Sequence, residues 1–315
     1  MRSGAVVTVV IPTHNRPQLL RRTLDSVLNQ EDVPVEVVIV DDGGAARASD
    51  ALDGQGLQHV RVIRHERSKG VSAARNAGLA TVGTPWVAFV DDDDLWAPRK
   101  LAAQLDALAA TPAARWSCVD AAHVDADLRV LLYNRVSSPE DVHTNLTRGN
   151  AVPGGGSGVL VDSELAREVG GFDEDISILA DWDFNLRLSS RSPVAPVREL
   201  LVAYFVHIDS MYHNPTGVLR ELRYLERKHS AMPDGRSFHF ERGPWYTNLG
   251  IMSHRTGDNR GAVAFLARAV PYTATVPTLR EMHASLPRVF RRRPPSWPAD
   301  VKLTSWLQRY AGSLS

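Results

Sequence analysis

The sequence predicts an α/β fold built on a doubly wound, mostly parallel β-sheet, followed by a mainly helical C-terminal region. Three observations support this prediction: short β-branched apolar runs that suit strands buried on both faces, helical periodicity between those runs, and acidic residues directly after two of them. Strands and helices that alternate at this length form a right-handed parallel sheet, whose ligands bind at the carboxyl ends of the strands.

The composition is that of a globular protein. The chain has 315 residues, of which 43% are hydrophobic and 23% charged, so it can bury a sizeable core and is neither disordered nor collagenous. The formal net charge of +0 argues against a dedicated nucleic-acid binder, which usually carries a basic excess. The single cysteine, Cys118, cannot form an internal disulfide and is expected in the core, which fits a reduced cytoplasm.

The first hundred residues contain four expected strands, at 5–11, 35–40, 60–63 and 86–90. Pro12 should end the first strand, and Asn15 should cap a helix that tolerates Pro17 in its first turn and runs to about residue 30. A second helix is expected over 71–80. Asp41 and Asp42 follow the second strand, and residues 91–94 are four consecutive aspartates after the fourth.

The pattern is less regular after residue 100. Helices are expected at 101–110, from a Ser163 cap to about residue 170, and at 181–188, with strands at 159–162 and 200–207. Beyond Pro215 the sequence reads as mainly helical, with apolar periodicity over 219–225 and 249–270. We therefore expect a domain over 1–215, divided at about residue 100 into donor-binding and acceptor-binding parts, and a helical region over 216–315.

Four consecutive carboxylates at one edge of a sheet repel one another unless a cation neutralises them. Mg²⁺ and Mn²⁺ prefer oxygen ligands and are commonly held by one or two carboxylates together with substrate phosphates. The alternative is a solvated acidic turn before the next helix. Asp41 and Asp42, at the end of what we take to be the neighbouring strand, either contact the same ligand or form an ordinary Asp-Asp-Gly-Gly turn.

Five ordered segments resemble the nucleotide-sugar domain of inverting family-2 glycosyltransferases with the GT-A fold. They are VVIPTHNRPQLLRRTLDSVLNQ, VVIVDDGG, SKGVSAARNAGLA, VAFVDDDDLWAP and GSGVLVDSELAREVGGFDEDI, and the resemblance continues through ADWDFNLRL to about residue 210. It covers roughly two-thirds of the chain, and the joint match is more specific than any single Asp-x-Asp motif.

The resemblance implies a nucleotide site whose residues come from four of these segments. Pro12 and Thr13 match the turn that lies against the nucleotide, and Asp42 matches the aspartate that reads a uracil or thymine edge. We assign Asn15, Arg16 and Arg75 to the same nucleotide site, although Arg75 would alternatively brace the aspartates instead of pairing with phosphate.

The same resemblance implies a divalent cation, Mn²⁺ or Mg²⁺, and a single base. Residues 91–93 match the Asp-x-Asp signature, with Asp93 as the direct metal ligand, Asp91 as a further one and Asp92 near the ribose. His207 resembles a histidine that approaches the metal or diphosphate in some members. Asp181 matches the catalytic base, although Ala180 replaces the glutamate that usually precedes it.

This chemistry predicts transfer of a sugar from a UDP- or dTDP-sugar to an acceptor hydroxyl with inversion at the anomeric carbon, since one base and no covalent intermediate are implied. A saccharide, a lipid-linked saccharide or a small molecule would serve as acceptor. The alternative is a non-catalytic member that binds a nucleotide sugar or a partner through the same fold. A receiver-like phosphoacceptor domain would also gather aspartates at strand ends, but it leaves Asp181 and most of the chain unexplained.

Several further features complete the expectations. Arg187 is expected to anchor the helix that carries Asp181, and the glycine-rich residues 154–158 are expected to form a flexible loop at the acceptor site. Residues 216–315 hold 16 Lys and Arg against 7 Asp and Glu, and a basic stretch at 291–293 beside Trp297 and Trp306 would suit contact with anionic lipid. No signal peptide or membrane helix is evident, so we expect a cytoplasmic protein, peripheral at the inner face of the membrane if the basic region binds lipid; the oligomeric state is left open.

Overall fold

The computed structural model describes residues 4–52, 57–206, 214–232, 235–255, 257–273 and 305–310. Contacts divide the chain into two compact units, one formed by 1–206 with 305–315 and the other by 207–304. The boundary expected at residue 215 coincides with the start of α7 (Pro215–Lys228), inside the second unit. The end of the chain, which the sequence assigned to the helical region, groups with the first unit.

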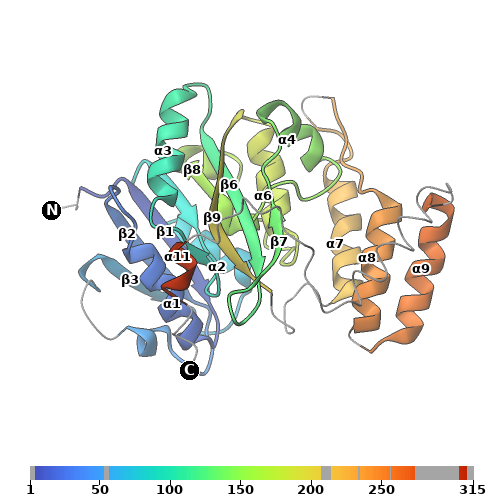
Figure 1. Ribbon diagram of the computed structural model, residues 1–315, viewed down its shortest axis with the longest axis horizontal. Helices are drawn as coiled ribbons and strands as arrows, with labels where there is room; N and C mark the ends of the chain where they lie inside the picture. The colour runs from blue at the N-terminus through green and yellow to red at the C-terminus, as the bar shows by residue number, and fades with distance from the viewer. Residues whose placement is uncertain are drawn as a thin grey trace. The chain divides into compact units, whose positions relative to one another are not determined.

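The first unit is built on one nine-stranded mixed sheet with the order β3-β2-β1-β4-β8-β6-β9-β5, with β7 paired to β6 (Figure 1). Its strands are β1 (Val7–Thr13), β2 (Val35–Asp41), β3 (Val60–Arg64), β4 (Trp86–Phe89), β5 (Leu95–Trp96), β6 (Trp116–Val124), β7 (Val130–Asn134), β8 (Val159–Asp162) and β9 (Val194–Phe205). The first four strands are parallel, as predicted. The other half departs from that prediction, because β8 runs antiparallel to both β4 and β6 while β6 and β9 are parallel.

β1 is the central strand of the parallel half, and all seven of its residues are buried. The expectation that Pro12 ends this strand is wrong, because β1 continues to Thr13, which pairs with Asp41 of β2. The reason lies in the register: β4 pairs only with Val7 to Val10 of β1, so Pro12, which has no backbone N–H to donate, lies beyond the end of β4. β1 therefore delivers Thr13 to the carboxyl edge of the sheet.

Six helices accompany the strands of the sheet in the sequence: α1 (Pro17–Leu28), α2 (Val71–Leu79), α3 (Lys100–Ala110), α4 (Pro139–Leu146), α5 (Ser163–Glu168) and α6 (Ala180–Ser189). α2 packs on β1 and β2, and α3 packs on β6 and β9. Two expected caps are wrong. The N-cap of α1 is Arg16, while Asn15 has φ +58° and its Oδ1 accepts from the Ala46 amide at 3.0 Å; α5 is capped by Asp162, which accepts from the Leu165 amide.

The region that lacked clear periodicity contains β6, β7 and α4, none of which the sequence predicted. β6 is hard to recognise because Asp120 lies buried at its centre, where it accepts hydrogen bonds from the Tyr133 hydroxyl at 2.6 Å and the Val136 amide at 2.7 Å. Cys118 on the same strand is a buried free thiol, as expected. β9 is longer than the expected strand at 200–207, since it begins at Val194 and ends at Phe205.

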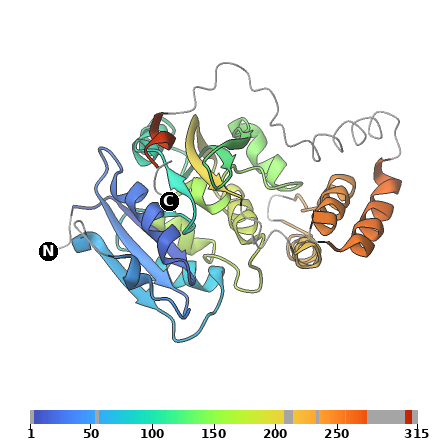
Figure 2. The same cartoon turned by 60° about the horizontal axis from the view of Figure 1, so that its bottom comes forward.

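The described residues of the second unit form α7, α8 (Arg242–Arg255) and α9 (Asn259–Thr273), drawn in orange in Figures 1 and 2. α7 contacts α8, and α8 contacts α9 along its length. The apolar periodicity over 249–270 thus belongs to two helices that meet near Gly257. Their close approach needs Gly250, because a Cβ there would lie 2.7 Å from Cγ of Leu266.

The short helix α11 (Ser305–Gln308) groups with the first unit, and both Trp306 and Leu307 are buried. Burial, followed by the charge of Asp25 on α1, raises the pKa of Tyr310, so this segment lies close to α1. Trp306 is therefore not available to a lipid surface, and residues 291–293 with Trp297 lie outside the described residues, so the predicted membrane contact stays a prediction. Among the residues described, no helix combines the length and apolar character that crossing a membrane requires.

Candidate active site

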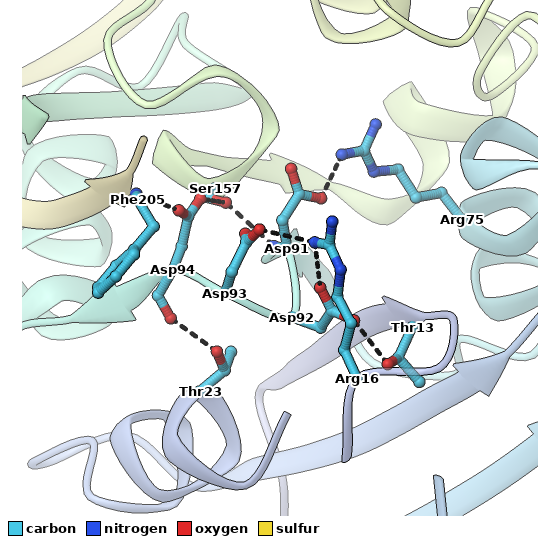
Figure 3. Close-up of polar contacts among 10 residues, drawn as sticks. All are labelled: Thr13, Arg16, Thr23, Arg75, Asp91, Asp92, Asp93, Asp94, Ser157 and Phe205. Carbon is cyan, nitrogen blue, oxygen red and sulfur yellow. Dashed lines mark hydrogen bonds and ion pairs between the residues drawn. The ribbon is translucent and has the colours of Figure 1, made fainter. Parts of the chain in front are cut away.

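The four aspartates at 91–94 form a turn at the carboxyl end of β4, and their side chains point in different directions (Figure 3). Asp91 pairs with Arg75, Asp92 accepts from the Thr13 hydroxyl at 2.6 Å, and Asp93 pairs with Arg16 at 2.9 Å. Asp94 points inward. The turn thus presents Asp91 and Asp93 as partly exposed oxygens, whose side chains are 31% and 15% accessible, while its other two carboxylates are buried.

Asp92 illustrates how strongly like charges are crowded in this turn. Burial and the neighbouring charge of Asp93 raise the pKa of Asp92 to about 7, against the opposing effects of the Thr13 hydroxyl and Arg16. Burial, and then the charges of Asp93 and Asp91, hold the pKa of Asp94 well above its usual range. The turn therefore carries an excess of acceptors that a proton or a cation would relieve.

The end of β1 supplies the cationic and hydroxyl partners of this turn. Thr13 is its last residue, and Arg16 at the N-cap of α1 reaches Asp92 and Asp93 with the same nitrogen, at 3.4 and 2.9 Å. Thr13 and Arg16, both predicted site residues, are thus in direct contact with the acidic turn. Pro12 lies in β1 itself, and Asn15 contacts the segment after β2 instead of the aspartates.

Asp42 lies one strand away from the position we expected, because β1 separates β2 from β4. It is buried, and its carboxylate accepts four hydrogen bonds from the segment between β3 and α2: His65 Nδ1 at 2.7 Å, the Ser68 hydroxyl at 2.6 Å, and the amides of Lys69 and Gly70 at 2.9 Å each. Burial alone would raise the pKa of Asp42, but these hydrogen bonds outweigh it and lower the pKa. A base that contacts Asp42 would have to replace one of these donors.

Asp41, beside Asp42, has a structural role. Its carboxylate pairs with Arg64 of β3 and accepts from the Ala48 amide at 2.9 Å and the Gly43 amide at 3.2 Å. Gly43 has φ +73°, and a Cβ there would lie 2.7 Å from Cα of Arg67, so this turn requires glycine. The turn reading of the Asp-Asp-Gly-Gly segment is therefore confirmed for Asp41, whereas contact between Asp42 and a ligand stays a prediction.

Arg75 connects the acidic turn to Asp181. It extends from α2, is almost fully buried, pairs with Asp91, and its guanidinium carbon lies 5.0 Å from the centre of the Phe172 ring. Burial would lower the pKa of Arg75, but the charges of Asp91 and then Asp181 raise it. Of the two roles considered for Arg75, bracing the aspartates is the one that these contacts favour.

Asp181 is in the first turn of α6. Its Oδ2 accepts from Asn150 Nδ2 at 3.2 Å, and its Oδ1 accepts from the Trp182 amide at 2.8 Å. Burial is the main reason that the pKa of Asp181 is raised, while Arg75, Asn150 and the Trp182 amide oppose that rise. A carboxylate with a raised pKa and a cation beside it is suited to accept a proton near neutral pH.

The neighbouring residues on α6 serve the helix, as expected. Asp183 is fully buried and pairs with Arg187, whose Nη2 and Nε lie 2.5 and 2.9 Å from the same Asp183 oxygen. Arg187 also donates to the carbonyl oxygen of Val169 at the end of α5. This pair fixes α6 and leaves Asp181 as the carboxylate of the helix that takes part in the site.

Two site residues were not predicted. Asn150 follows α4 in a segment without periodicity, and no pattern in the sequence marks it. Tyr204 lies on β9 with its ring 5.1 Å from that of His123, and burial, followed by the charges of Asp94, Asp91 and Asp181, raises its pKa well above the usual range. The only signal for Tyr204 was its place near the carboxyl end of an expected strand, the edge at which ligands bind.

The metal prediction was tested against the oxygens that these residues supply. No three or more His, Cys, Asp or Glu side chains are arranged to hold a metal ion within the described part of the chain, and His207 lies outside that part. Asp91 and Asp93 nevertheless offer accessible carboxylate oxygens, which Mg²⁺ or Mn²⁺ accepts when phosphates complete the coordination. The residues thus fit a cation that would bind together with a diphosphate once Arg16 leaves Asp93, while Arg75 occupies only one oxygen of Asp91.

Comparison with known proteins supports the family resemblance and the fold. Residues 8–161 match the family model described as "Glycosyl transferase family 2". An uncharacterized glycosyltransferase of Haemophilus influenzae is 25% identical over 194 residues, which cover 61% of this chain and 65% of the relative, so the chain spans less than two-thirds of that relative's length.

Two solved structures share the fold. The mannosyltransferase PcManGT from Pyrobaculum calidifontis, in complex with GDP-Man and Mn²⁺, is similar with a TM-score of 0.55 and 19% identity over 98% of this chain and 85% of its own. S. aureus TarS 1-349 in complex with UDP gives 0.52 and 14% identity over 91% and 93%. The chain therefore has a GT-A fold with extra helices toward its C-terminus, and its residues 8–161 match the model of glycosyltransferase family 2.

Proposed function

We propose that this protein is a metal-dependent inverting glycosyltransferase that moves a sugar from a UDP- or dTDP-sugar to an acceptor hydroxyl. The observation that carries the proposal is the connection of two acidic centres from distant segments. The first centre is the donor-side aspartates at 91–93, and the second is Asp181 of α6. The buried side chain of Arg75 links them, because it forms an ion pair with Asp91 and interacts with the charge of Asp181.

The donor would bind at the carboxyl edge of β1, β2 and β4. Thr13 and Arg16 line the acidic turn, and the loop held by Asp42 lies at the end of β2. Arg16 is 39% accessible, so it can leave Asp93 and turn toward a diphosphate oxygen. Of the two similar structures, one is in complex with UDP and the other with GDP-Man, so the preference for uridine or thymidine must be tested by nucleotide binding.

Asp93 and Asp91 would hold the divalent cation. Such a cation, when bound, stabilises the negative charge that develops on the leaving diphosphate. The choice between Mn²⁺ and Mg²⁺ is not determined by two carboxylates, because both ions accept oxygen ligands.

Asp181 would take the proton of the acceptor hydroxyl as that oxygen attacks the anomeric carbon. Its raised pKa suits a group that must be ionised before the reaction and protonated after it. Asn150 donates to Oδ2 of Asp181 and thereby sets the orientation of the carboxylate. With a single base on the side opposite the leaving group, the reaction proceeds by direct displacement and inverts the anomeric carbon.

The substitution Asp181→Asn tests this assignment. Nucleoside diphosphate release from a panel of UDP- and dTDP-sugars, measured in Mn²⁺ with simple saccharide acceptors, should fall by about 10²-fold or more, since general-base catalysis contributes about that much. Donor binding should change little. Asp175→Asn, an exposed aspartate on the segment leading to α6, is the matched control and should keep wild-type turnover. Near-normal turnover of Asp181→Asn would remove Asp181 from the role of base.

A further inference from the structure

The glycine-rich residues 154–158, which we expected to be a flexible loop, form a tight turn wedged between the two acidic centres. The turn includes a short 3-10 helix, η3 (Gly155–Gly158), which β4, β6, β9 and α6 all contact. Gly154 and Gly155 have φ of +68° and +52°, a conformation that side chains rarely adopt. The backbone conformation itself therefore selects glycine at these two positions.

The space around the turn also excludes a side chain at Gly155 and at Gly158. A Cβ on Gly155 would collide with Oδ2 of Asp181, and a Cβ on Gly156 would lie 3.5 Å from Nη2 of Arg75. A Cβ on Gly158 would collide with the carbonyl oxygen of Pro153. One side of the turn thus lies close against Asp181 at Gly155 and near Arg75 at Gly156.

The other side of the turn is bonded to the aspartates through Ser157, which is fully buried (Figure 3). The Ser157 hydroxyl donates to Oδ2 of Asp94 at 2.5 Å and accepts from the Asp91 amide at 3.1 Å. Its carbonyl oxygen accepts from the Trp96 indole at 3.0 Å. One hydroxyl therefore joins both ends of the acidic turn to η3.

Asp94 extends this connection to the rest of the sheet. Its Oδ1 accepts from the Phe205 amide at 3.0 Å, and its carbonyl oxygen accepts from the Thr23 hydroxyl of α1 at 2.9 Å. The four-aspartate turn is thus tied to η3, β9 and α1 through a residue that does not face the ligand side. These hydrogen bonds explain why the run has a fourth aspartate, since binding of a metal or a nucleotide would not require Asp94.

We propose that the turn at residues 154–158 is a positioning element that sets Asp181 and Arg75 relative to the acidic turn, with Ser157 and Gly155 as the residues on which this depends. The proposal rests on the function proposed above for these carboxylates. Ser157 acts on the donor side by fixing the backbone at Asp91, and Gly155 acts on the acceptor side by allowing close approach to Asp181.

The first test is Ser157→Ala in the full chain, with Ser192→Ala as the matched control. Ser192 is also buried, and its hydroxyl also accepts a backbone amide, that of Arg115 at 2.9 Å, at the opposite end of β9. Hydrogen exchange needs no ligand: exchange of the Asp91 amide should accelerate at least tenfold in Ser157→Ala and stay within twofold in Ser192→Ala. Calorimetric titration with UDP in Mn²⁺ should show at least tenfold weaker binding for Ser157→Ala alone.

The second test is Gly155→Ala, which perturbs the Asp181 side and also serves if Ser157→Ala does not fold. We expect kcat for nucleoside diphosphate release to fall at least tenfold while UDP affinity stays within threefold, because Asp181 must move and the donor side is untouched. A purely structural glycine would change thermal stability without this split. Unchanged Asp91 exchange in Ser157→Ala, or an unchanged kcat in Gly155→Ala, would overturn the proposal. If the wild-type protein bound no nucleoside diphosphate, the proposed function would fail, and the exchange measurement would still decide the role of Ser157.

Discussion

Replacing Arg75 by glutamine removes the positive charge between the two acidic centres while keeping an amide in its place. The change leaves Asp91 without its ion-pair partner and Asp181 without the cation that most strongly opposes the rise of its pKa. Breaking a fully buried pair costs about 3–5 kcal/mol, but the Asp91 side chain is 31% accessible and water can hydrate it, so we expect a smaller loss of stability, about 2–3 kcal/mol. In a domain of this size that corresponds to a fall in Tm of roughly 5–10 °C.

The same substitution should alter the pH dependence of transfer. Asp181 must be ionised to act as base, so activity rises with pH through its pKa. Arg75 lowers that pKa, and its removal raises it, so the acid limb of the kcat/KM profile for the donor should move to higher pH in Arg75→Gln. Activity lost near neutrality should be partly recovered in more alkaline buffer.

The assay combines thermal unfolding with a pH profile of nucleoside diphosphate release, and Arg115→Gln is the control. Arg115 also pairs with two carboxylates, Asp162 at 2.8 Å and Glu168 at 3.0 Å, but at an exposed position away from the site. Such a surface pair contributes about 0–1 kcal/mol, so the control should lose little stability and keep its acid limb. An acid limb that does not move in Arg75→Gln would refute the coupling of Arg75 to Asp181.

Three further predictions concern single residues. Asp93→Ala should abolish the metal dependence of nucleoside diphosphate binding, and calorimetry in Mn²⁺ and in chelator that still differed as in the wild type would contradict it. Asp42→Ala removes the acceptor of four hydrogen bonds, so it should lower Tm and reduce discrimination among nucleoside diphosphates in competition binding; retained discrimination would argue against a role at the base. Lys100 is fully buried with its ammonium 2.9 Å from Gln104 Oε1 and 3.8 Å from the centre of the Trp96 ring, and burial lowers its pKa well below the usual range. The free energy of unfolding is therefore greatest above the pKa of an unfolded lysine, and it falls as the pH decreases toward the folded pKa of Lys100. Lys100→Met should remove this loss and raise the unfolding free energy at pH 7 by about 1–2 kcal/mol. Urea unfolding at pH 9 and pH 7 that showed the same loss of stability for both proteins would count against this prediction.

The parallel half of the fold could be predicted because its strands are uninterrupted β-branched runs buried on both faces, as in β1 and β2. The carboxyl ends of such strands meet at one edge, which predicted a ligand site at the acidic turn, and the resemblance to family-2 glycosyltransferases added Thr13 to that site. The position of Asp42 was less well predicted, since strand order is a tertiary property and β1 separates β2 from β4.

The segment from β6 to α4 could not be predicted because its core includes polar groups whose hydrogen-bond partners lie on other segments, whereas α3, β8, α5 and α6 agree with the expected elements. β6 buries Asp120, whose bonds to Tyr133 and Val136 come from β7 and the segment beyond it. Asn150 lies in an irregular segment, and its contact with Asp181 depends on the packing of α4 against α6. The glycine-rich sequence at 154–158 predicts a flexible loop when it is considered alone. Its conformation is instead fixed by contacts with residues far along the chain.

The most direct test of the account is calorimetric titration of the full chain with UDP, dTDP, GDP and CDP, each in Mn²⁺ and in chelator, with Asp93→Ala alongside. We predict that UDP or dTDP binds most tightly, that chelator weakens this binding at least tenfold, and that Asp93→Ala binds equally weakly in both conditions. A folded wild-type sample that binds none of the four, or binds one equally well with and without Mn²⁺, would contradict the claim that the turn after β4 is a metal-dependent nucleotide site.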